Sequence, residues 1–568
     1  MSAGAHRRSP SEGTPAGRTI VEIAIRRARE QSGRPAYTFL SGAEETACLS
    51  FAQLDLAARE IAAGLLEVAQ PGDRALLVYE MGPDFVCAFY GCLYAGLIAV
   101  PIPAPEASRL QATPQRVRSV ATDCAARLLL GNARTFELLR ASGVDSGLDS
   151  GMEWRDTRRY AGQRALEAVH PPDPDALAYL QYTSGSTSTP KGVMLSHANL
   201  MEHLTAMKQA LEYDAASVSV CWMPHFHDYG LIEGYLMPLF NGTPAYLLSA
   251  FAFLKRPVCW LEAISRYRGT HTQGPNFAFR YCARRVTPEQ RAGLDLSCLR
   301  SAGLGAEPIH PATSDTFYVL FAPCGLRREA VRPAYGLAEA TLMVTASPME
   351  EPPQVTVFDA AALGRGAALP LPGAAGEGQA VAACGRPLPG TEVAIVDPTT
   401  CRRLEPGAVG EVWVCSAGVG QGYWGRPEES AQTFRAAIAG EPGSAYLRTG
   451  DLGFLHAGQL TITARLKDLI IIHGLNHHPP DIEWTAQQAD PALRADHGAA
   501  FSVAVEGEER LVIVQELERG DYTDDALDDI YLRVLQAVAD YHGIALHGLA
   551  LVRRGAVPKT SSGKIQRQ

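Results

Sequence analysis

The sequence predicts an α/β fold: a large domain of layered α/β sheets with a small β-barrel-like subdomain, followed by a small α+β domain. Three observations support this. At 568 residues the chain is too long for one core. Short apolar runs that read as buried strands alternate with helical patterns through its first half, which is typical of largely parallel sheets. A Val-, Gly- and turn-rich stretch, residues 385–423, is typical of a small β-barrel-like subdomain, and about a hundred residues remain after it.

Local patterns place the individual elements along the chain. Residues 19–66 read as helices with a hairpin-like interruption, and residues 74–79 read as a buried strand before a helix that begins near Pro83. The nearly uncharged stretch 85–103 contains Pro101 and Pro103, which close a helix, so it is expected to be a buried helix and strand rather than a membrane span. Further strands are expected at residues 126–130, 176–181, 218–222, 245–248 and 469–472. Residues 360–378, rich in Gly, Ala and Pro, are expected to form an inserted surface loop.

Composition excludes some classes of function. A net charge of -10 and the lack of a long Lys/Arg run argue against a nucleic-acid partner. The 12 cysteines show no CxxC pair, which predicts reduced, mostly buried thiols in a cytoplasmic protein. The first 18 residues are polar, have no signal-peptide apolar region, and read as a flexible tail.

The most informative segment is residues 182–192, where hydroxyl and glycine residues precede one lysine. Glycines let backbone N–H groups approach an anion, hydroxyls add donors and the lysine adds a charge, so the segment predicts a phosphate cradle. It is not a Walker A loop, because Lys191 follows Pro190 and no Ser or Thr comes after it. A solvated linker is the alternative, although it offers little reason for the sequence from Pro190 to Gly192. The cradle residues are Thr183, Ser184, Gly185, Ser186, Thr187 and Lys191.

Four other segments carry residues that a bare scaffold does not need. His227 follows a predicted strand, where ligand sites of open α/β sheets lie. The small-residue turn 301–308 lets a flat ring lie against backbone, and Tyr335 and Glu339 would share one side of a helical turn. Residues 446–453 put Asp451 in a turn suited to a ribose diol, and residues 558–564 again combine hydroxyls, a glycine and a lysine, Lys564.

These motifs, in this order, resemble the adenylate-forming superfamily, which includes acyl-CoA synthetases, luciferases and nonribosomal peptide adenylation domains. The resemblance runs from residue 19 to residue 568. Within the superfamily, the segment from His227 to Ile232 is similar to the HDxGLI signature of fatty acyl-AMP ligases. Residues 355–381 stand where those ligases carry an insertion.

The resemblance implies an adenylation domain at residues 19–464, a hinge at 465–468, and a mobile C-terminal lid domain at 469–568. It also implies that a fatty acid is activated with ATP and Mg²⁺ to acyl-adenylate and pyrophosphate. The acyl group would then pass to the phosphopantetheine thiol of an acyl carrier protein, in lipid, polyketide or hybrid peptide biosynthesis. The insertion would restrain the lid and disfavour coenzyme A. A carrier domain fused downstream is one arrangement that this leaves open.

The resemblance also implies roles for single residues. Lys564 would bridge the carboxylate and the α-phosphate, His227 would orient the carboxylate, and Glu339 would bind Mg²⁺. The cradle would hold pyrophosphate, with Lys191 adding charge or holding the loop. The residues expected to contact adenine or ribose are Gly305, Ala306, Glu307, Ala334, Tyr335, Gly336, Ala340, Asp451 and Arg465.

Two alternatives remain open at this point: a fatty acyl-CoA synthetase, and a non-catalytic acyl-adenylate-binding module. The second is kept open by His473 and Leu475, which stand where relatives commonly carry arginines; Ala464 replaces a usual glycine. Relatives that activate amino acids carry an aspartate at the position of His227, and this aspartate holds the α-ammonium group of the substrate. This chain has a histidine there, and a histidine cannot hold an ammonium at neutral pH, so the position favours fatty acids. Apolar residues downstream could line an acyl tunnel, although core positions are the safer expectation: Phe251, Phe253, Leu254, Phe277 and Phe279.

Overall fold

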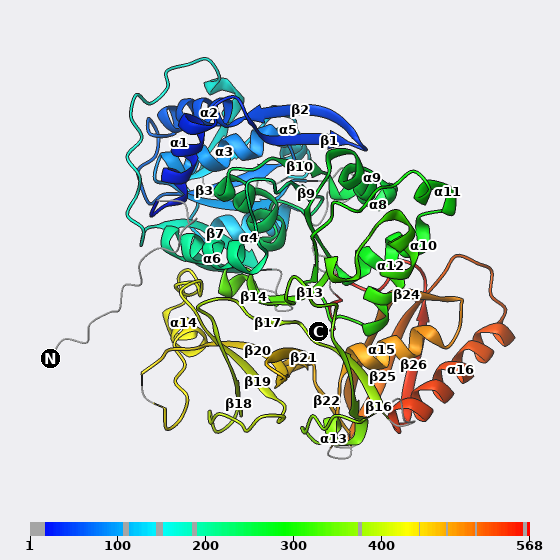
Figure 1. Ribbon diagram of the computed structural model, residues 1–568. Coiled ribbons are helices and arrows are strands. Elements are labelled where there is room, and N and C mark those ends of the chain that lie inside the picture. Colours follow the sequence, from blue (N-terminus) through cyan, green and yellow to red (C-terminus); the bar gives the residue numbers. More distant parts are fainter. Residues whose placement is uncertain are drawn as a thin grey trace.

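The computed structural model describes residues 17–105, 113–143, 151–183, 190–372, 378–441, 443–472, 475–505, 508–559 and 565–567. Most of the predicted phosphate cradle (184–189), His473 and Lys564 lie outside the described residues. The molecule contains two large sheets, whose strands interleave along the chain, followed by a four-stranded sheet and a C-terminal α+β unit (Figure 1). The layered arrangement predicted from the alternating pattern is therefore confirmed.

The first large sheet has nine strands, and its inner strands are parallel. The antiparallel strands β2, β14 and β17 lie at its two ends. In spatial order the strands are β17 (Arg386–Pro387), β14 (Met343–Ala346), β13 (Val331–Gly336), β12 (Ser301–Gly305), β11 (His271–Pro275), β9 (Ser219–Cys221), β10 (Ala245–Leu248), β1 (Pro35–Ser41) and β2 (Glu44–Ser50).

The second large sheet has six strands, five of them parallel and the last, β8, antiparallel. Its strands are β6 (Glu153–Asp156), β5 (Leu128–Gly131), β3 (Arg74–Tyr79), β4 (Ile98–Pro103), β7 (Leu177–Thr183) and β8 (Lys191–Ser196). β7 and β8 form the hairpin whose connection is the predicted cradle, and Thr183 pairs with Lys191 at its base. The cradle therefore begins and ends on two neighbouring strands.

Helices cover these sheets, and their ends follow the local sequence. Thr19 caps the first helix by accepting a hydrogen bond from the Glu22 N–H, Ser50 and Gln53 form a capping box, and Pro83 stands in the first turn of α3. The α-helices are α1 (Ile20–Glu30), α2 (Phe51–Leu65), α3 (Pro83–Tyr94), α4 (Thr113–Asp123), α5 (Ala133–Ala141), α6 (His197–Ala210), α7 (Met237–Asn241), α8 (Ala250–Lys255), α9 (Val258–Tyr267), α10 (Asn276–Arg285), α11 (Pro288–Arg291) and α12 (Pro311–Phe321). Short 3₁₀ turns are η2 (Thr157–Tyr160), η4 (Ala322–Cys324), η5 (Arg328–Ala330) and η6 (Ala338–Ala340).

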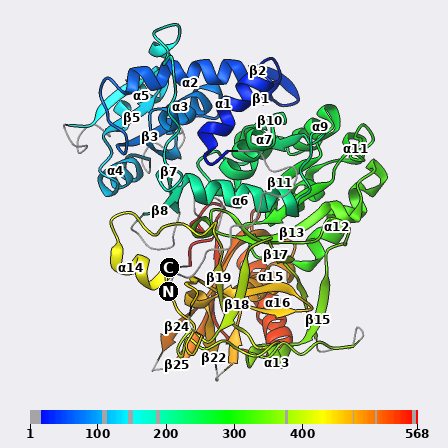
Figure 2. The same cartoon turned by 60° about the vertical axis from the view of Figure 1, so that its left-hand side comes forward.

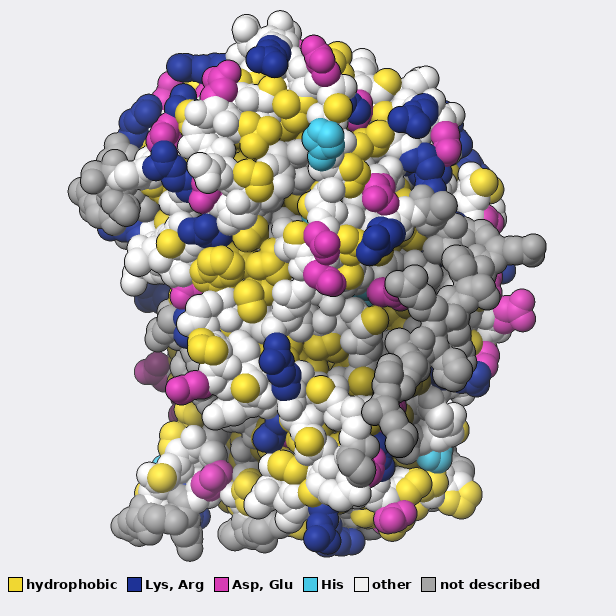
Figure 3. Space-filling model, turned by 90° about the vertical axis from the view of Figure 1, so that its left-hand side faces the viewer, with side chains coloured by type: hydrophobic (Ala, Val, Ile, Leu, Met, Phe, Trp, Pro, Cys, Tyr) yellow, Lys and Arg dark blue, Asp and Glu magenta, His cyan; other side chains and the backbone are white. Residues whose placement is uncertain are grey.

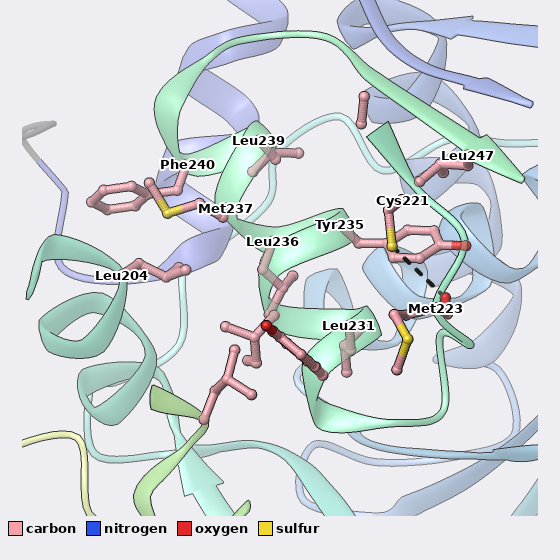
Figure 4. Packing of buried hydrophobic residues seen from close by; sticks show 14 of the residues in the cluster. Leu204, Cys221, Met223, Leu231, Tyr235, Leu236, Met237, Leu239, Phe240 and Leu247 are labelled. Carbon is pink, nitrogen blue, oxygen red and sulfur yellow. Dashed lines mark hydrogen bonds between the residues drawn. The ribbon is translucent and has the colours of Figure 1, made fainter. Parts of the chain in front are cut away.

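The core lies between the sheets and the helices that cover them. A π-helical segment, η3 (Gly230–Leu236), is buried along its whole length and continues directly into α7. Figure 4 shows Leu231, Tyr235 and Leu236 of this segment packed among apolar side chains of neighbouring elements. Because η3 follows His227 at once, this packing fixes the backbone that carries the histidine.

The apolar residues considered for an acyl tunnel divide between core and surface. Phe253 is fully buried and stacks on Trp222 with ring centroids 3.9 Å apart, and Phe279 is fully buried against Trp260. Phe251 is 75% exposed and Leu254 is 50% exposed. The core interpretation is therefore correct for Phe253 and Phe279.

The predicted β-barrel-like subdomain is an open antiparallel sheet and not a closed barrel. Its strands are β18 (Glu392–Val396), β19 (Gly410–Cys415), β20 (Leu447–His456) and β21 (Gln459–Arg465), with α14 (Pro427–Phe434) beside them. Among the described residues β18 and β21 do not pair with each other. Trp413, fully buried, packs on one face with Tyr446, so a side-chain cluster closes that face without a barrel.

Residues 360–378, predicted to be a surface loop, are more structured than expected. β15 (Val355–Asp359) and β16 (Gly378–Ala382) form an antiparallel pair, and Asp359 caps α13 (Ala360–Gly364). Phe358 and Leu363 are buried against Phe454 of β20. Phe358, just before the Gly- and Ala-rich stretch, and Leu363, inside it, supply the apolar anchors of this segment. We call residues 355–382 the insertion hairpin.

The C-terminal unit has its own core and is α+β, as predicted. A 3₁₀ turn, η7 (Leu466–Asp468), leads into β22 (Ile470–Ile472), β23 (Leu475–His477), α15 (Pro479–Gln488), β24 (Leu493–Val505), β25 (Glu508–Leu517), α16 (Asp524–His542) and β26 (Leu546–Val552). Figure 2 shows this unit below the large sheets, with the insertion hairpin along its edge. Gln379 Nε2 of the hairpin donates a 2.6 Å hydrogen bond to Asp481 Oδ2 of α15.

The sequence also led to predictions about membrane crossing, cysteine pairing and surface charge. In the parts of the chain that the structure describes, no helix combines the length and the apolar character that crossing a bilayer requires. The 12 cysteines are unpaired and mostly buried, as predicted. On the face shown in Figure 3, Lys and Arg side chains lie among Asp and Glu side chains. The described part of that face therefore shows no broad basic field.

Candidate active site

The predicted adenine turn lies at the carboxyl ends of two neighbouring parallel strands. β12 ends at Gly305 and β13 runs beside it, with Leu304 opposite Pro333. A Cβ on Gly305 would stand 3.0 Å from the Ala334 carbonyl oxygen, so glycine permits the close approach of the two backbones. Ala306 follows with a φ of 62°, and Glu307 accepts a 2.9 Å hydrogen bond from the Phe277 N–H. Strand ends of this kind form ligand sites in α/β sheets.

Tyr335 and Glu339 do not share a helical turn, contrary to the expectation. Tyr335 lies in β13 and Glu339 lies in η6, because the chain folds back sharply between them: a Cβ on Gly336 would stand 1.8 Å from the Leu342 carbonyl oxygen. Ala340, which follows Glu339, is buried. Because Tyr335 and Glu339 lie in different elements, their side chains contact different partners.

The partner of Tyr335 is Asp451, the residue predicted to bind the ribose. The Tyr335 hydroxyl donates to Asp451 Oδ2 at 2.7 Å, while Asp451 Oδ1 lies 3.3 Å from Arg465 Nε on the neighbouring strand. Tyr335, Asp451 and Arg465 thus form one cluster, as their predicted common ligand requires. Burial, followed by the charge of Asp451, raises the pKa of the Tyr335 hydroxyl well above its usual value, so this group remains a donor.

An ion pair that the sequence analysis missed lies beside Asp451. Asp451 itself stands inside strand β20 and not in the expected turn, although the strand is irregular there: Gly450 has a φ of 70° and the β19–β20 register shifts between Glu411 and Trp413. Glu411 is 2% exposed and accepts from Arg448 Nη2 at 2.7 Å and Nε at 3.1 Å. Glu411 Oε1 also accepts from the Gly450 N–H at 3.2 Å. Glu411 therefore fixes the irregular part of β20 that precedes Asp451. Only the pairing of β19 with β20 brings Glu411 there, and no local pattern reveals that pairing.

Glu339 belongs to a second cluster with the base of the cradle. Tyr423 donates its hydroxyl to Glu339 Oε1 at 2.8 Å, and Lys191 Nζ lies 5.2 Å from the centre of the Tyr423 ring. Lys191 also forms an ion pair with Glu429 of α14. In this structure Lys191 therefore ties the end of the cradle to α14. Tyr423, too, was absent from the sequence-based predictions.

The His227 segment is held by backbone contacts. Gln181 Nε2 of β7 donates to the Phe226 carbonyl oxygen at 3.0 Å, and a Cβ on Gly230 would stand 2.1 Å from the Pro224 oxygen. His227 Nδ1 lies 2.6 Å from Asp228 Oδ1, and both side chains are at most 16% exposed. The Asp228 carboxylate thus faces Nδ1 of the His227 ring, and the second ring nitrogen, Nε2, takes no part in this contact.

Electrostatic interactions join the clusters. Burial raises the pKa of the Glu339 carboxyl; the hydrogen bond from Tyr423 and the charge of Arg465 oppose that rise, and the charge of Asp228 adds to it. Glu339 therefore lies within electrostatic reach of both Arg465 and Asp228. Among the described residues no three His, Cys, Asp or Glu side chains converge as a metal cage. A single carboxylate linked through Tyr423 to Lys191, at the base of the predicted cradle, nevertheless fits Mg²⁺, which takes one or two carboxylates together with phosphate oxygens and water.

The C-terminal unit docks beside the adenine turn. Trp484 of α15 stacks on His310, with ring centroids 3.3 Å apart, and Arg280 of α10 lies 4.5 Å from the Trp484 ring centre. Arg280 also pairs with Asp496 of β24. Lys559 Nζ donates to the Asp496 carbonyl oxygen at 2.6 Å. Lys559 therefore lies near the interface between the two parts of the molecule.

The remaining predicted site residues are those of the cradle and the C-terminal lysine. Ser184, Gly185, Ser186, Thr187 and Lys564 fall outside the described residues, as does the side chain of Thr183.

Comparison with known proteins identifies the family of the chain. The model of the family described as "AMP-binding enzyme" matches residues 25–424. A medium-chain-fatty-acid–[acyl-carrier-protein] ligase of Moorena producens is 45% identical over 97% of this chain and 94% of its own length. A long-chain-fatty-acid–AMP ligase of Mycobacterium tuberculosis is 36% identical over 91% of this chain and 89% of its own.

Solved structures give the same result. A fatty acyl-adenylate ligase from L. pneumophila, in complex with acyl adenylate and pyrophosphate, is 34% identical and covers 96% of this chain and 94% of its own, with a TM-score of 0.75. The resemblance inferred from the motifs is thus confirmed across nearly the whole chain. On the family match and the long, closely similar relatives, this chain belongs to the AMP-binding enzyme family.

Proposed function

We propose that this protein is a fatty acyl-AMP ligase, which activates a fatty acid with ATP to acyl-adenylate and pyrophosphate. The observation that carries the proposal is the bond between Tyr335 and Asp451, the predicted adenine and ribose residues, together with the link from Glu339 through Tyr423 to Lys191 at the base of the cradle. The relatives described above are named as fatty-acid ligases and match this chain over most of their own length, which supports fatty acids as the substrate class.

Each cluster has a role in this reaction. Tyr335 stacks on adenine against Gly305, Ala306 and Glu307, and Asp451 accepts the ribose hydroxyls beside Arg465. The cradle from Thr183 to Thr187 holds pyrophosphate. A carboxylate attacking a polyanion meets repulsion, so catalysis depends on positioning and on the placement of cations.

Three residues are proposed to act nearest to the bond that forms. His227, with Nδ1 facing Asp228, presents Nε2 to the fatty carboxylate. Glu339 holds Mg²⁺, which when bound would neutralise phosphate charge. Lys564 bridges the carboxylate and the α-phosphate in the transition state. Lys564→Ala is expected to abolish adenylation and preserve ATP binding, and unaltered adenylate formation would remove this role.

The acceptor is proposed to be the phosphopantetheine thiol of an acyl carrier protein. The relative from Moorena producens is named as a ligase to such a carrier. The insertion hairpin supports this choice, because its Gln379 contacts Asp481 and so holds the C-terminal unit from a second side. A restrained unit disfavours the rearrangement that free coenzyme A requires.

One assay tests the function and its two rivals. Pyrophosphate release is measured over fatty acids of graded length, with ATP and with either coenzyme A or a holo acyl carrier protein. Acyl-AMP that accumulates without a carrier and is consumed with it supports the proposal. Abundant acyl-CoA would favour a synthetase, and no release with any acid would favour a non-catalytic binder.

A further inference from the structure

One arginine ties the last described residues to the turn that joins the two parts of the molecule. Arg567 donates from Nε and Nη2 to the two carboxylate oxygens of Glu483 on α15, each at 2.7 Å. Its Nη1 donates to Asp468 Oδ2 of η7 at 3.3 Å. A guanidinium held by a parallel pair of bonds is fixed in direction as well as in position.

The cluster is shielded from water. The side chains of Arg567, Glu483 and Asp468 are 16%, 12% and 11% exposed. Burial raises the pKa of the Glu483 carboxyl, and the Arg567 charge opposes that rise. Without Arg567, two shielded carboxylates would face each other, so the arginine is needed to keep this corner together.

The other flank of the same segment is also anchored. Lys559 pairs with Ile565 in an antiparallel bridge, and Lys559 Nζ donates to the Asp496 carbonyl oxygen. The Val557 N–H donates to Glu516 Oε1 at 3.0 Å. Lys564 is three residues from Arg567, and three extended residues span at most about 11 Å. The Arg567 contacts therefore fix a point of the chain three residues after Lys564 in the sequence.

We propose that Arg567 is a positioning residue of the adenylation step, which holds the chain at Lys564 in place by joining it to α15 and to the hinge turn. The proposal rests on the function proposed above and on the role of Lys564 in it. Glu483 and Arg567 belong to the same C-terminal unit, so their bond persists when that unit moves. Asp468 stands in the turn about which the unit would rotate, so its bond to Arg567 belongs to the docked arrangement of the unit.

The test compares Arg567→Gln with a matched control in the same unit. Arg533 of α16 forms a 2.7 Å ion pair with Asp490 and has no part in the proposed chemistry, so Arg533→Gln is expected to leave activity unchanged. Arg567→Gln should lower the kcat of pyrophosphate release about 100-fold, the cost of a misplaced catalytic group, with little change in the KM for ATP. Arg567→Lys keeps the charge without the paired bonds and should recover only part of the rate.

A second measurement separates positioning from general structural damage. Acyl transfer from preformed acyl-AMP to the carrier protein does not require Lys564 to bridge a carboxylate and the α-phosphate, so Arg567→Gln should preserve it. If Arg567→Gln does not fold, Asp468→Asn is tested in its place. This variant removes the charged acceptor of Arg567 Nη1 and keeps the pair between Arg567 and Glu483. It is expected to slow pyrophosphate release at an unchanged melting temperature.

The outcomes distinguish the two proposals. A wild-type chain that released no pyrophosphate with any fatty acid would count against the proposed function. An active wild type, with Arg567→Gln and Asp468→Asn both as fast as Arg533→Gln, would overturn the positioning role alone. Equal losses in adenylation and in transfer would likewise overturn it, since they would indicate a purely structural contribution.

Discussion

The Tyr335 hydroxyl donates a 2.7 Å hydrogen bond to Asp451 Oδ2, and this bond joins two residues 116 positions apart. It connects the end of β13 in the nine-stranded sheet with β20 in the four-stranded sheet. The residues proposed to hold adenine and ribose are thus oriented by each other before a nucleotide arrives. Pre-organisation of this kind lowers the entropic cost of binding.

Tyr335→Phe keeps the ring and removes this bond. The loss of one partly buried hydrogen bond is expected to cost about 1 kcal/mol in the free energy of unfolding, measured by urea denaturation. The KM for ATP should rise a few-fold with kcat unchanged, whereas Tyr335→Ala, which also removes the ring, should raise it much further. Equal KM values for the two variants would contradict a stacking role for the ring.

Glu411 provides a separate test of the irregular part of β20 at Gly450, next to Asp451. Glu411→Gln retains an oxygen for the Gly450 N–H but loses the charge opposite Arg448, which is 32% exposed, so the loss in stability is expected to be about 2 kcal/mol. Glu411→Ala also removes the bond to the Gly450 N–H and should in addition raise the KM for ATP. Thermal unfolding and steady-state kinetics check the two effects, and an Ala variant with unchanged KM would show that this part of β20 is held by other contacts.

Lys191 has two proposed uses, adding charge to the cradle or holding the loop, and its partner Glu429 distinguishes them. If Lys191 mainly ties the loop to α14, Glu429→Gln and Lys191→Met should weaken ATP binding to a similar extent. If it supplies charge to the phosphates, only Lys191→Met should do so. Isothermal titration with ATP measures both, and the exposed pair itself is expected to contribute no more than about 1 kcal/mol to stability.

Domain docking is expected to depend on pH through His310. Burial against Trp484, followed by the charge of Arg280, lowers the pKa of His310 from 6.5 to about 4 in the docked arrangement. Between these two values the undocked state binds more protons, so docking weakens as the pH falls through that window and does not change above it. Small-angle X-ray scattering should show an expanded molecule at the acidic end. In His310→Phe, which keeps the stacking, this contribution should vanish, and an identical pH response in that variant would exclude His310 as its source.

The sequence predicted those elements whose signals are local. Pro83 stands at the start of α3 and Pro103 at the end of β4, whereas Pro101 lies inside β4; continuous apolar runs mark the parallel strands. The insertion hairpin was missed because its two strands lie on either side of the Gly- and Ala-rich segment, and because Phe358 is buried against a residue nearly a hundred positions away. The barrel-like expectation failed because strand count and composition do not determine whether a sheet closes.

The same division applies to the site. Glycines, hydroxyls and single charged residues in short motifs identified the family, and the comparisons confirm it. Tyr423, Glu411 and Arg567 were not identified, because each is one ordinary residue outside those motifs. What makes them relevant is strand register or a contact across the fold, and a single sequence does not display either.

The stacking of Trp484 between His310 and Arg280 has a practical consequence. This indole is one of six in the chain, and its surroundings are built from both parts of the molecule. If the two parts separated, water would replace the His310 imidazole and the Arg280 guanidinium around the Trp484 indole. Trp484 is therefore expected to report, by its intrinsic fluorescence and without an added label, any separation of the two parts.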